Sequence, residues 1–140
     1  MDWSQLAALA KAGHEIGSHS ATHEILPLLD DAALEAEVAG SRRTLEQELG
    51  VPVRAFCYPN GDFDERTIRA VAAAGYLCAV SVLQGNNDAA AEPYRLRRRF
   101  IHEDRLAGPR SKPSSTLLRL ELSGLADRVF MRNRAREVRP

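Results

Sequence analysis

Two histidines stand close together in the segment 13-GHEIGSHSATH-23, directly after a predicted strand. Glu15 to Ser18 form this brief strand, so His19 falls at its C-terminal end. His19 and His23 are four positions apart, and on a helical turn their imidazoles would point the same way. Two such imidazoles can bind one divalent ion at about 2.0–2.1 Å, with an oxygen ligand and a water completing the site. The spacing alone is weak evidence, because histidine pairs of this kind also occur by chance on surfaces.

Helices are predicted on both sides of this segment, each between a polar N-cap and a closing glycine. These boundaries are Ser4 to Gly13, Asp30 or Asp31 to Gly50, and Asp64 to Gly75. The long middle helix carries an apolar stripe that must pack on something. Its charged residues, including Glu37 and Glu46, are expected to face mostly outward.

Strands are predicted between the helices. Val53 to Tyr58 and Tyr76 to Val82 are apolar runs bounded by turn residues, and Tyr94 to Ile101 is a candidate last strand with unusual charge. Alternating strands and helices predict an α/β fold with a parallel sheet, whose functional residues gather at the C-terminal ends of the strands. His19 and the turn of residues 58–61 are therefore expected on one rim.

The composition is that of a globular domain. With 44% hydrophobic and 27% charged side chains, 140 residues are enough for one domain with a buried core. No apolar run approaches the roughly 18 residues that cross a bilayer, and the first residues do not read as an export signal, so the location is expected to be cytoplasmic or is left unassigned. Cys57 and Cys78 lie in apolar segments, which favours buried free thiols over a disulfide.

The zero net charge conceals two opposed halves. Residues 1–94 carry 6 basic and 14 acidic side chains, whereas residues 95–140 carry 13 basic and 5 acidic ones. This favours a tail that folds back against an acidic body over one that meets an anionic membrane or nucleic acid, so no nucleic-acid partner is expected. Residues 105–114 are a predicted linker, and residues 115–140 a basic amphipathic helix and tail.

A second motif, FCYPNG at residues 56–61, accompanies the histidine pair. With both motifs, the chain from about Trp3 to Ile101 resembles the polysaccharide deacetylase family, which includes chitooligosaccharide and peptidoglycan deacetylases. The family's H-[ST]-x-x-H motif corresponds to residues 19–23, and its Phe-x-x-Pro-x-Gly motif to residues 56–61. Gly85-Asn86-Asn87 and Leu96-Arg97-Arg98 resemble the branch encoded with exopolysaccharide genes.

The resemblance implies that residues 1–104 form part of an irregular (β/α) barrel, incomplete in this chain. It also implies hydrolysis of N-acetyl groups on a polysaccharide or amino sugar by a bound divalent metal, expected to be zinc. His19 and His23 would be two metal ligands, and an Asp from an upstream motif the third. No such motif lies among the 18 residues before His19, so the chain is expected to be N-terminally truncated, inactive alone and prone to associate through an exposed barrel edge.

Further site residues follow from the same resemblance. The backbone N–H of Asn60 would help to hold the oxyanion, and Tyr58 and Pro59 would contact the substrate. His102 is a loose counterpart of the family's general acid. Cys57 stands where many relatives carry an Arg.

Three alternatives stay open on the residues alone. Arg97, with its neighbours in the run 97–99, either recognises an anionic polysaccharide by bidentate contacts or lies on a solvated strand edge. Asp62 and Asp64 could replace the missing base, but turn and N-cap roles are favoured. Finally, the chain is either a deacetylase fragment or a non-catalytic carbohydrate-binding or regulatory remnant, unless the basic C-terminal helix is itself the functional part.

Overall fold

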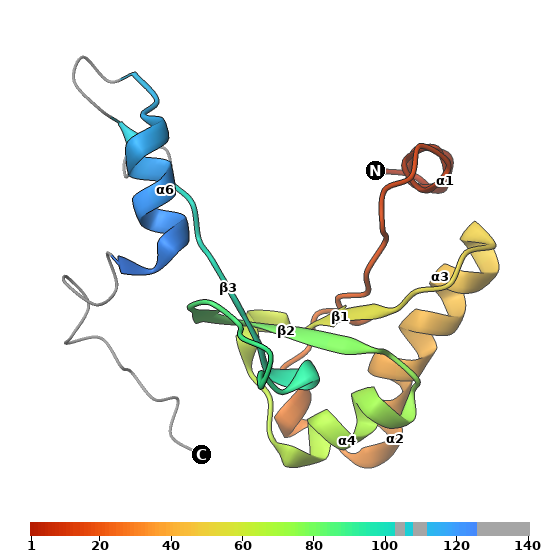
Figure 1. Cartoon of the computed structure of the whole chain (residues 1–140). Coiled ribbons are helices and arrows are strands. Elements are labelled where there is room, and N and C mark those ends of the chain that lie inside the picture. The colour runs from red at the N-terminus through yellow and green to blue at the C-terminus, as the bar shows by residue number, and fades with distance from the viewer. Residues whose placement is uncertain (103–105, 108–111, 126–140) are drawn as a thin grey trace.

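A computed structural model gives this chain a parallel sheet in the order β1-β2-β3 (Figure 1). The strands are β1 Ala55–Cys57, β2 Cys78–Gln84 and β3 Leu96–Arg98. Ala55 pairs with Cys78, and Val80 with Leu96. The carboxyl ends of the three strands therefore meet at one edge of the sheet. The structure describes residues 1–102, 106–107 and 112–125.

The helices lie where the sequence predicts them, with one correction at a cap and one inside the long helix. They are α1 Trp3–Lys11, α2 Asp31–Glu35, the π-helical η2 Ala36–Gly40, α3 Ser41–Leu49, α4 Glu65–Ala73 and α6 Ser115–Ser123. Short 3₁₀ helices are η1 Leu26–Leu28, η3 Pro59–Gly61 and η4 Pro93–Arg95. Asp2, not Ser4, caps α1, because the Asp2 carboxylate and the Gln5 side chain form a reciprocal capping box. The long predicted helix is three joined segments, α2, η2 and α3.

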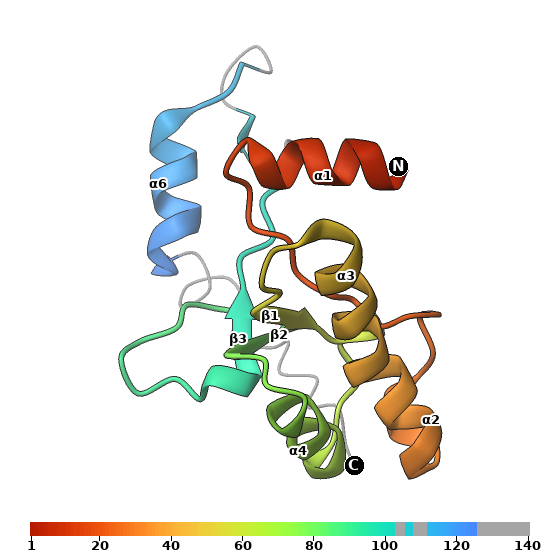
Figure 2. The ribbon, with the colours of Figure 1, turned by 90° about the vertical axis from the view of Figure 1, so that its right-hand side faces the viewer.

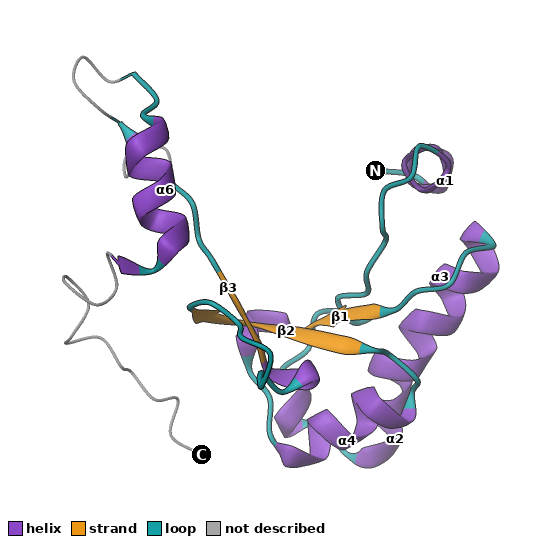
Figure 3. Ribbon diagram, in the orientation of Figure 1, coloured by secondary structure: helices purple, strands orange, loops and turns teal. Residues whose placement is uncertain are grey.

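The hydrophobic core lies between the sheet and the helices α2 to α4, which cover one face of it (Figure 3). The strands contribute Phe56 and Ala79, and the helices Leu34, Val38 and Val71, all almost completely buried. Each large apolar side chain buried in this way stabilises the fold by about 1.5–3 kcal/mol. The core thus fixes the helical run against β1 and holds the edge where the strands end.

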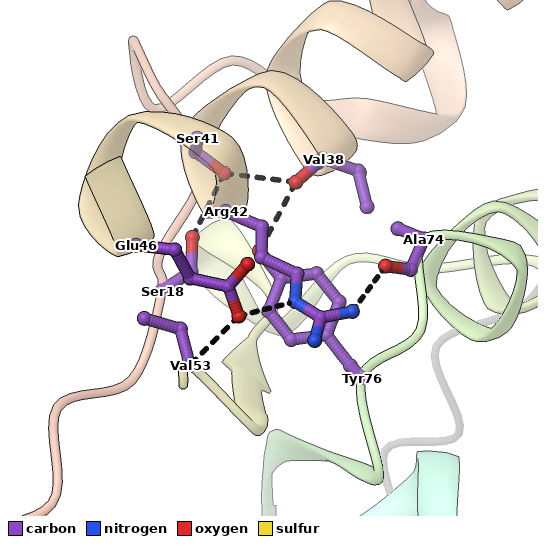
Figure 4. A network of polar contacts seen from close by, with 8 residues as sticks. All are labelled: Ser18, Val38, Ser41, Arg42, Glu46, Val53, Ala74 and Tyr76. Carbon is purple, nitrogen blue, oxygen red and sulfur yellow. Dashed lines mark hydrogen bonds and ion pairs between the residues drawn. The ribbon is translucent and has the colours of Figure 1, made fainter. Parts of the chain in front are cut away.

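The predicted strand at residues 15–18 shrinks to one position. Ser18 makes a parallel bridge to Phe56: its N–H donates to Ala55 O at 2.9 Å, and Cys57 N–H donates to Ser18 O at 2.8 Å. The Ser18 hydroxyl also bonds the Ser41 hydroxyl on α3 at 2.8 Å (Figure 4). Although short, this attachment places His19 at the carboxyl edge of β1.

A closed barrel is not found over the described residues, whose sheet is open. The chain beyond β3 instead leads to α6, which stands past the end of that strand in both views (Figure 1 and Figure 2). In the predicted linker, Ala107 and Pro113 form an antiparallel bridge, and Ser114 caps α6. Residues 126–140, which hold most of the predicted basic helix and tail, lie outside the described residues. Within those that are described, no helix combines the length and the apolar character needed to cross a bilayer.

Candidate metal and substrate site

His19 and His23 lie side by side at the end of the sheet. Their ring centroids are 4.9 Å apart and the ring planes make an angle of 77°. A loop rather than the expected helical turn brings them together, since Ala21 and Thr22 form a bend and Ser20 and His23 have φ values of 65° and 66°. These left-handed positions reverse the chain within five residues, so the two rings converge without a helix.

The His19 ring is oriented by the backbone of β1. Its Nδ1 lies 2.8 Å from the carbonyl oxygen of Cys57. A carbonyl can only accept a hydrogen bond, so Nδ1 donates, and in a neutral imidazole Nε2 then carries the lone pair. Metal-binding histidines are commonly oriented in this way, by a bond from the second ring nitrogen to a carbonyl or carboxylate. The sequence could not reveal this acceptor, because it is a main-chain atom.

The spacing of the two rings fits two ligands of one metal ion. Imidazoles that share a tetrahedral ion through bonds of about 2.0–2.1 Å have ring centroids roughly 5 Å apart, which agrees with the 4.9 Å found here. Both side chains are exposed. Among the described residues, no group of three or more His, Cys, Asp or Glu side chains gathers as a complete ligand set. The two imidazoles are thus close enough to bind one divalent ion, while the described residues supply no complete set of ligands around them.

A buried carboxylate supports the loop between the two histidines. Glu37 is 8% exposed and accepts from the N–H groups of Ala21 and Thr22, both at 2.9 Å, and from the Thr22 hydroxyl at 2.6 Å. Burial opposes ionisation of Glu37, but these bonds prevail and lower its pKa below the ordinary value of 4.5. The expected outward orientation of Glu37 is wrong, because it lies in the π-helical segment, whose wider turn shifts the helical phase.

The corner at residues 58–61 stands at the carboxyl end of β1. Asn60 is exposed with φ of 55°, and Gly61 follows with φ of 80°. Tyr58 is fully buried, and its hydroxyl donates to Tyr94 O at 2.9 Å. Burial raises the Tyr58 pKa far above its ordinary value. A direct contact between the Tyr58 ring and a sugar, as predicted, does not fit this burial, and the Pro59 side chain is likewise enclosed.

The two acidic residues after this corner have structural roles. Asp64 caps α4, where its carboxylate accepts from the N–H and the hydroxyl of Thr67, both at 2.7 Å. The N-cap interpretation of Asp64 is thus confirmed. Asp62 follows η3 directly and donates its N–H to Pro59 O at 3.0 Å.

Arg97 and His102 belong to a different part of the molecule. The backbone of Arg97 is paired with the Asn87 side chain. Arg97 also lines a cavity of about 350 Å³ between the ends of β2 and β3 and the end of α6. None of the residues that line this cavity comes from the histidine loop. His102 is exposed beyond β3, with its ring 6.0 Å from that of Phe100, on the segment that leads toward α6 (Figure 1).

Known proteins resemble the first part of the chain in sequence. The profile of the polysaccharide deacetylase family matches residues 1–79. An uncharacterised protein of Streptomyces coelicolor is 32% identical over 78 residues, which are 56% of this chain and 31% of that protein. Chitin deacetylase 1 of Cryptococcus neoformans is 36% identical over 62 residues, 44% of this chain and 13% of that enzyme. The chain thus spans less than a third of the length of these relatives.

Solved structures resemble a longer part of the chain. A polysaccharide deacetylase from Bacillus cereus is 26% identical, with a TM-score of 0.63 over 70% of this chain and 31% of its own. A Streptococcus pyogenes deacetylase in complex with acetate, 22% identical, shares the fold with a TM-score of 0.67 over 70% of this chain and 43% of its own. So does a Bacillus anthracis pseudoenzyme, 22% identical, with a TM-score of 0.51 over 53% of this chain and 26% of its own. From the match over residues 1–79, more than half of its length, the chain belongs to the polysaccharide deacetylase family.

Proposed function

We propose that this chain provides two imidazole ligands and an oxyanion-binding corner for the metal-dependent hydrolysis of N-acetyl groups on a polysaccharide or amino sugar. The observation that carries the proposal is the pairing of His19 and His23, with the His19 ring held by the Cys57 carbonyl. Family membership supports deacetylation as the reaction. Zinc suits two imidazoles and one carboxylate, and it is the metal that we propose.

Each residue of the site has a defined task in this proposal. A bound divalent metal would lower the pKa of a water molecule and polarise the acetyl carbonyl. His19, through Nε2, and His23 would hold that metal, while the N–H of Asn60 would stabilise the oxyanion. His102 lies on the exposed segment beyond β3, apart from the two histidines, so it is not proposed as the acid that protonates the leaving amine. A base that takes up the proton of the water is not assigned to any described residue, so we expect no turnover from the chain alone.

The substrate would be recognised away from the metal. Arg97 and Arg99 line the cavity at the end of β3, where two arginine side chains suit a carboxylate or phosphate on an anionic glycan. Asn60, which is exposed, would contact the sugar. Tyr58 and Pro59, which are buried, would hold the corner that carries Asn60. An extracellular or capsular polysaccharide is the class of substrate that we propose.

Zinc titration followed by calorimetry tests the metal site. The chain is expected to bind zinc with a stoichiometry near one, and His19→Ala or His23→Ala to abolish that binding. His14→Ala is the matched control, because this histidine is exposed in the same segment but precedes Ser18. Zinc binding that survives both substitutions, or that disappears equally with His14→Ala, would contradict the proposal.

A non-catalytic carbohydrate-binding or regulatory role is the second candidate. It is favoured by one observation, the lack of a complete three-ligand group among the described residues. Binding of acetylated chito-oligomers that is unchanged in His19→Ala and His23→Ala would select this role, whereas binding that requires zinc and both histidines would reject it.

A further inference from the structure

The carboxylate of Glu37 accepts hydrogen bonds from the segment between the two histidines, and none of these bonds involves a histidine ring. Its Oε2 accepts from two successive N–H groups, those of Ala21 and Thr22, and its Oε1 accepts from the Thr22 hydroxyl. Hydrogen bonds to an ionised acceptor are the strong ones, and two adjacent amides on one oxygen fix the peptide planes between them. One side chain thus determines how the chain turns between the two histidines.

This turn needs an external support. Ser20 and His23 both have positive φ, which costs free energy for residues with a Cβ and persists only where surrounding contacts impose it. Within the turn itself, His23 N–H donates to the Ser20 hydroxyl oxygen at 3.0 Å. Because Ala21 and Thr22 are exposed, water could take the place of Glu37 as an acceptor but would not impose one conformation.

The helical segment that carries Glu37 is itself held in place by hydrogen bonds. In the π-helical segment, the Val38 carbonyl accepts from the hydroxyls of Ser41 and Tyr76, both at 3.0 Å (Figure 4). Ser41 also bonds Ser18, the residue before His19. The position of Glu37 is therefore tied both to the core and to the strand-like segment that carries His19.

We propose that Glu37 is a positioning residue, whose carboxylate holds the His19–His23 loop in the shape that lets both imidazoles bind one metal ion. The inference rests on the proposed function, because it assigns the loop to metal binding. Metal ligation belongs to the two histidines, whereas Glu37 would set the shape of the loop before a metal binds. Loss of the carboxylate leaves both ligands in the chain but removes their fixed relation.

Zinc affinity measured on the whole chain provides the first test. Glu37→Gln keeps the size of the side chain but presents an amide to donors, and it is expected to weaken zinc binding by about 10-fold or more. Thr22→Val, a milder change that removes one donor, is expected to weaken it by a smaller factor. Glu46→Gln is the matched control: Glu46 lies on the same helical run and accepts from Val53 N–H and Arg42, but not from the loop. It should leave zinc affinity unchanged.

NMR of the metal-free chain distinguishes positioning of the loop from general stabilisation of the fold, because only positioning affects the contacts between the two rings. The unaltered chain is expected to show nuclear Overhauser effects between the His19 and His23 rings and slow exchange of the Ala21 and Thr22 amides. Both should be lost in Glu37→Gln and retained in Glu46→Gln, at temperatures where each variant is folded. If Glu37→Gln does not fold, Thr22→Val decides alone: unchanged ring contacts and affinity in that variant would overturn the inference.

The two proposals fail in different ways. If the unaltered chain shows no zinc binding through its histidines, the proposed function fails, whatever Glu37 does to the loop. If the chain binds zinc and Glu37→Gln binds it equally well, with the ring contacts intact, the positioning role fails and the metal site stands. Weaker binding with disordered loop amides, confined to the Glu37 and Thr22 variants, is the result that supports the inference.

Discussion

Non-glycine residues with positive φ lie in the segments of the candidate site. Three non-glycine residues among those described have positive φ, namely Ser20, His23 and Asn60. All three belong to the two segments, the histidine loop and the corner after β1, that the family resemblance singles out. Strained positions of this kind persist where the surroundings impose them, and such places are often functional. The turn geometry therefore points to the same residues as the motifs, by an independent route.

Gly61 is a residue where this strain and close packing combine. Its φ is +80°, and a Cβ added there would overlap Cγ2 of Val82 and lie 2.9 Å from Cγ1. Gly61→Ala is expected to destabilise the chain by about 2–4 kcal/mol, from the left-handed conformation plus the collision. Urea unfolding followed by circular dichroism measures it.

Gly50→Ala separates the two causes. Gly50 also has a positive φ, of 64°, but a Cβ there would meet nothing within 4 Å. Only the conformational cost of about 1 kcal/mol is expected. Equal losses in the two variants would show that the approach of Val82 to Gly61 has no energetic weight.

Single residues were predictable from the sequence only where their own side chain carries the signal. The histidine pair and the Asp64 cap are of this kind. The Cys57 carbonyl that orients His19 is a main-chain acceptor, which any residue at that position would provide. The Tyr58 hydroxyl bonds the backbone of Tyr94, 36 positions away, and no local pattern encodes that contact.

At the scale of the element, the long helix shows why Glu37 was misplaced. A regular period from Asp30 to Gly50 puts Leu34, Val38 and Leu45 inward and Glu37 outward. The π-helical turn at residues 36–40 adds room within the helix, so Glu37 and Val38 can both be buried. Existence and ends of the helix were predictable, since Asp30 caps it and Gly50 closes it with φ of 64°. Its internal change of phase was not.

The same helix makes a pH-dependent contact with Val53, in the segment that precedes β1. The bond from Val53 N–H, above all, lowers the pKa of Glu46 below its ordinary value of 4.5, and Arg42 adds to the effect. A carboxyl with a lowered folded-state pKa stabilises the fold at pH values above its unfolded-state pKa, and this contribution is lost as the pH falls through the folded-state pKa. The free energy of unfolding is therefore expected to fall as the pH is lowered from about 5.

Glu46→Gln should make this acid dependence shallower, measured by urea unfolding at a series of pH values. Some dependence should remain, because Glu37 and Asp64 also have lowered pKa values. Glu48→Gln removes a charge from an exposed position of the same helix, and it controls for charge alone. An acid dependence identical in the unaltered chain and Glu46→Gln would refute the assignment.

At the scale of the whole molecule, the sequence predicts the parallel sheet but not its extent. Alternating apolar strands and capped helices favour parallel pairing, and β1, β2 and β3 pair in that manner. The irregular barrel came from the family resemblance, and the described residues form an open sheet. Closure is a long-range property that requires the first and last strands of a sheet to pair, so no local motif could establish it.

The open sheet leads to a prediction about association. Ala79 and Ser81 of β2 face the core, whereas Val82 is 53% exposed, and helices α2 to α4 lie on the opposite face of the sheet (Figure 3). Parallel sheets are normally covered on both faces, because their strands are apolar on both sides.

We therefore expect the chain to associate reversibly as its concentration rises, which sedimentation velocity can measure. Val82→Thr keeps the branched shape but reduces the apolar surface, and it should lower the associated fraction at equal concentration. Leu28→Ser removes an apolar side chain that is 79% exposed on η1, away from the strands, and it should leave association unchanged. A chain that stays monomeric at all concentrations, or that both substitutions affect alike, would show that this sheet face needs no partner.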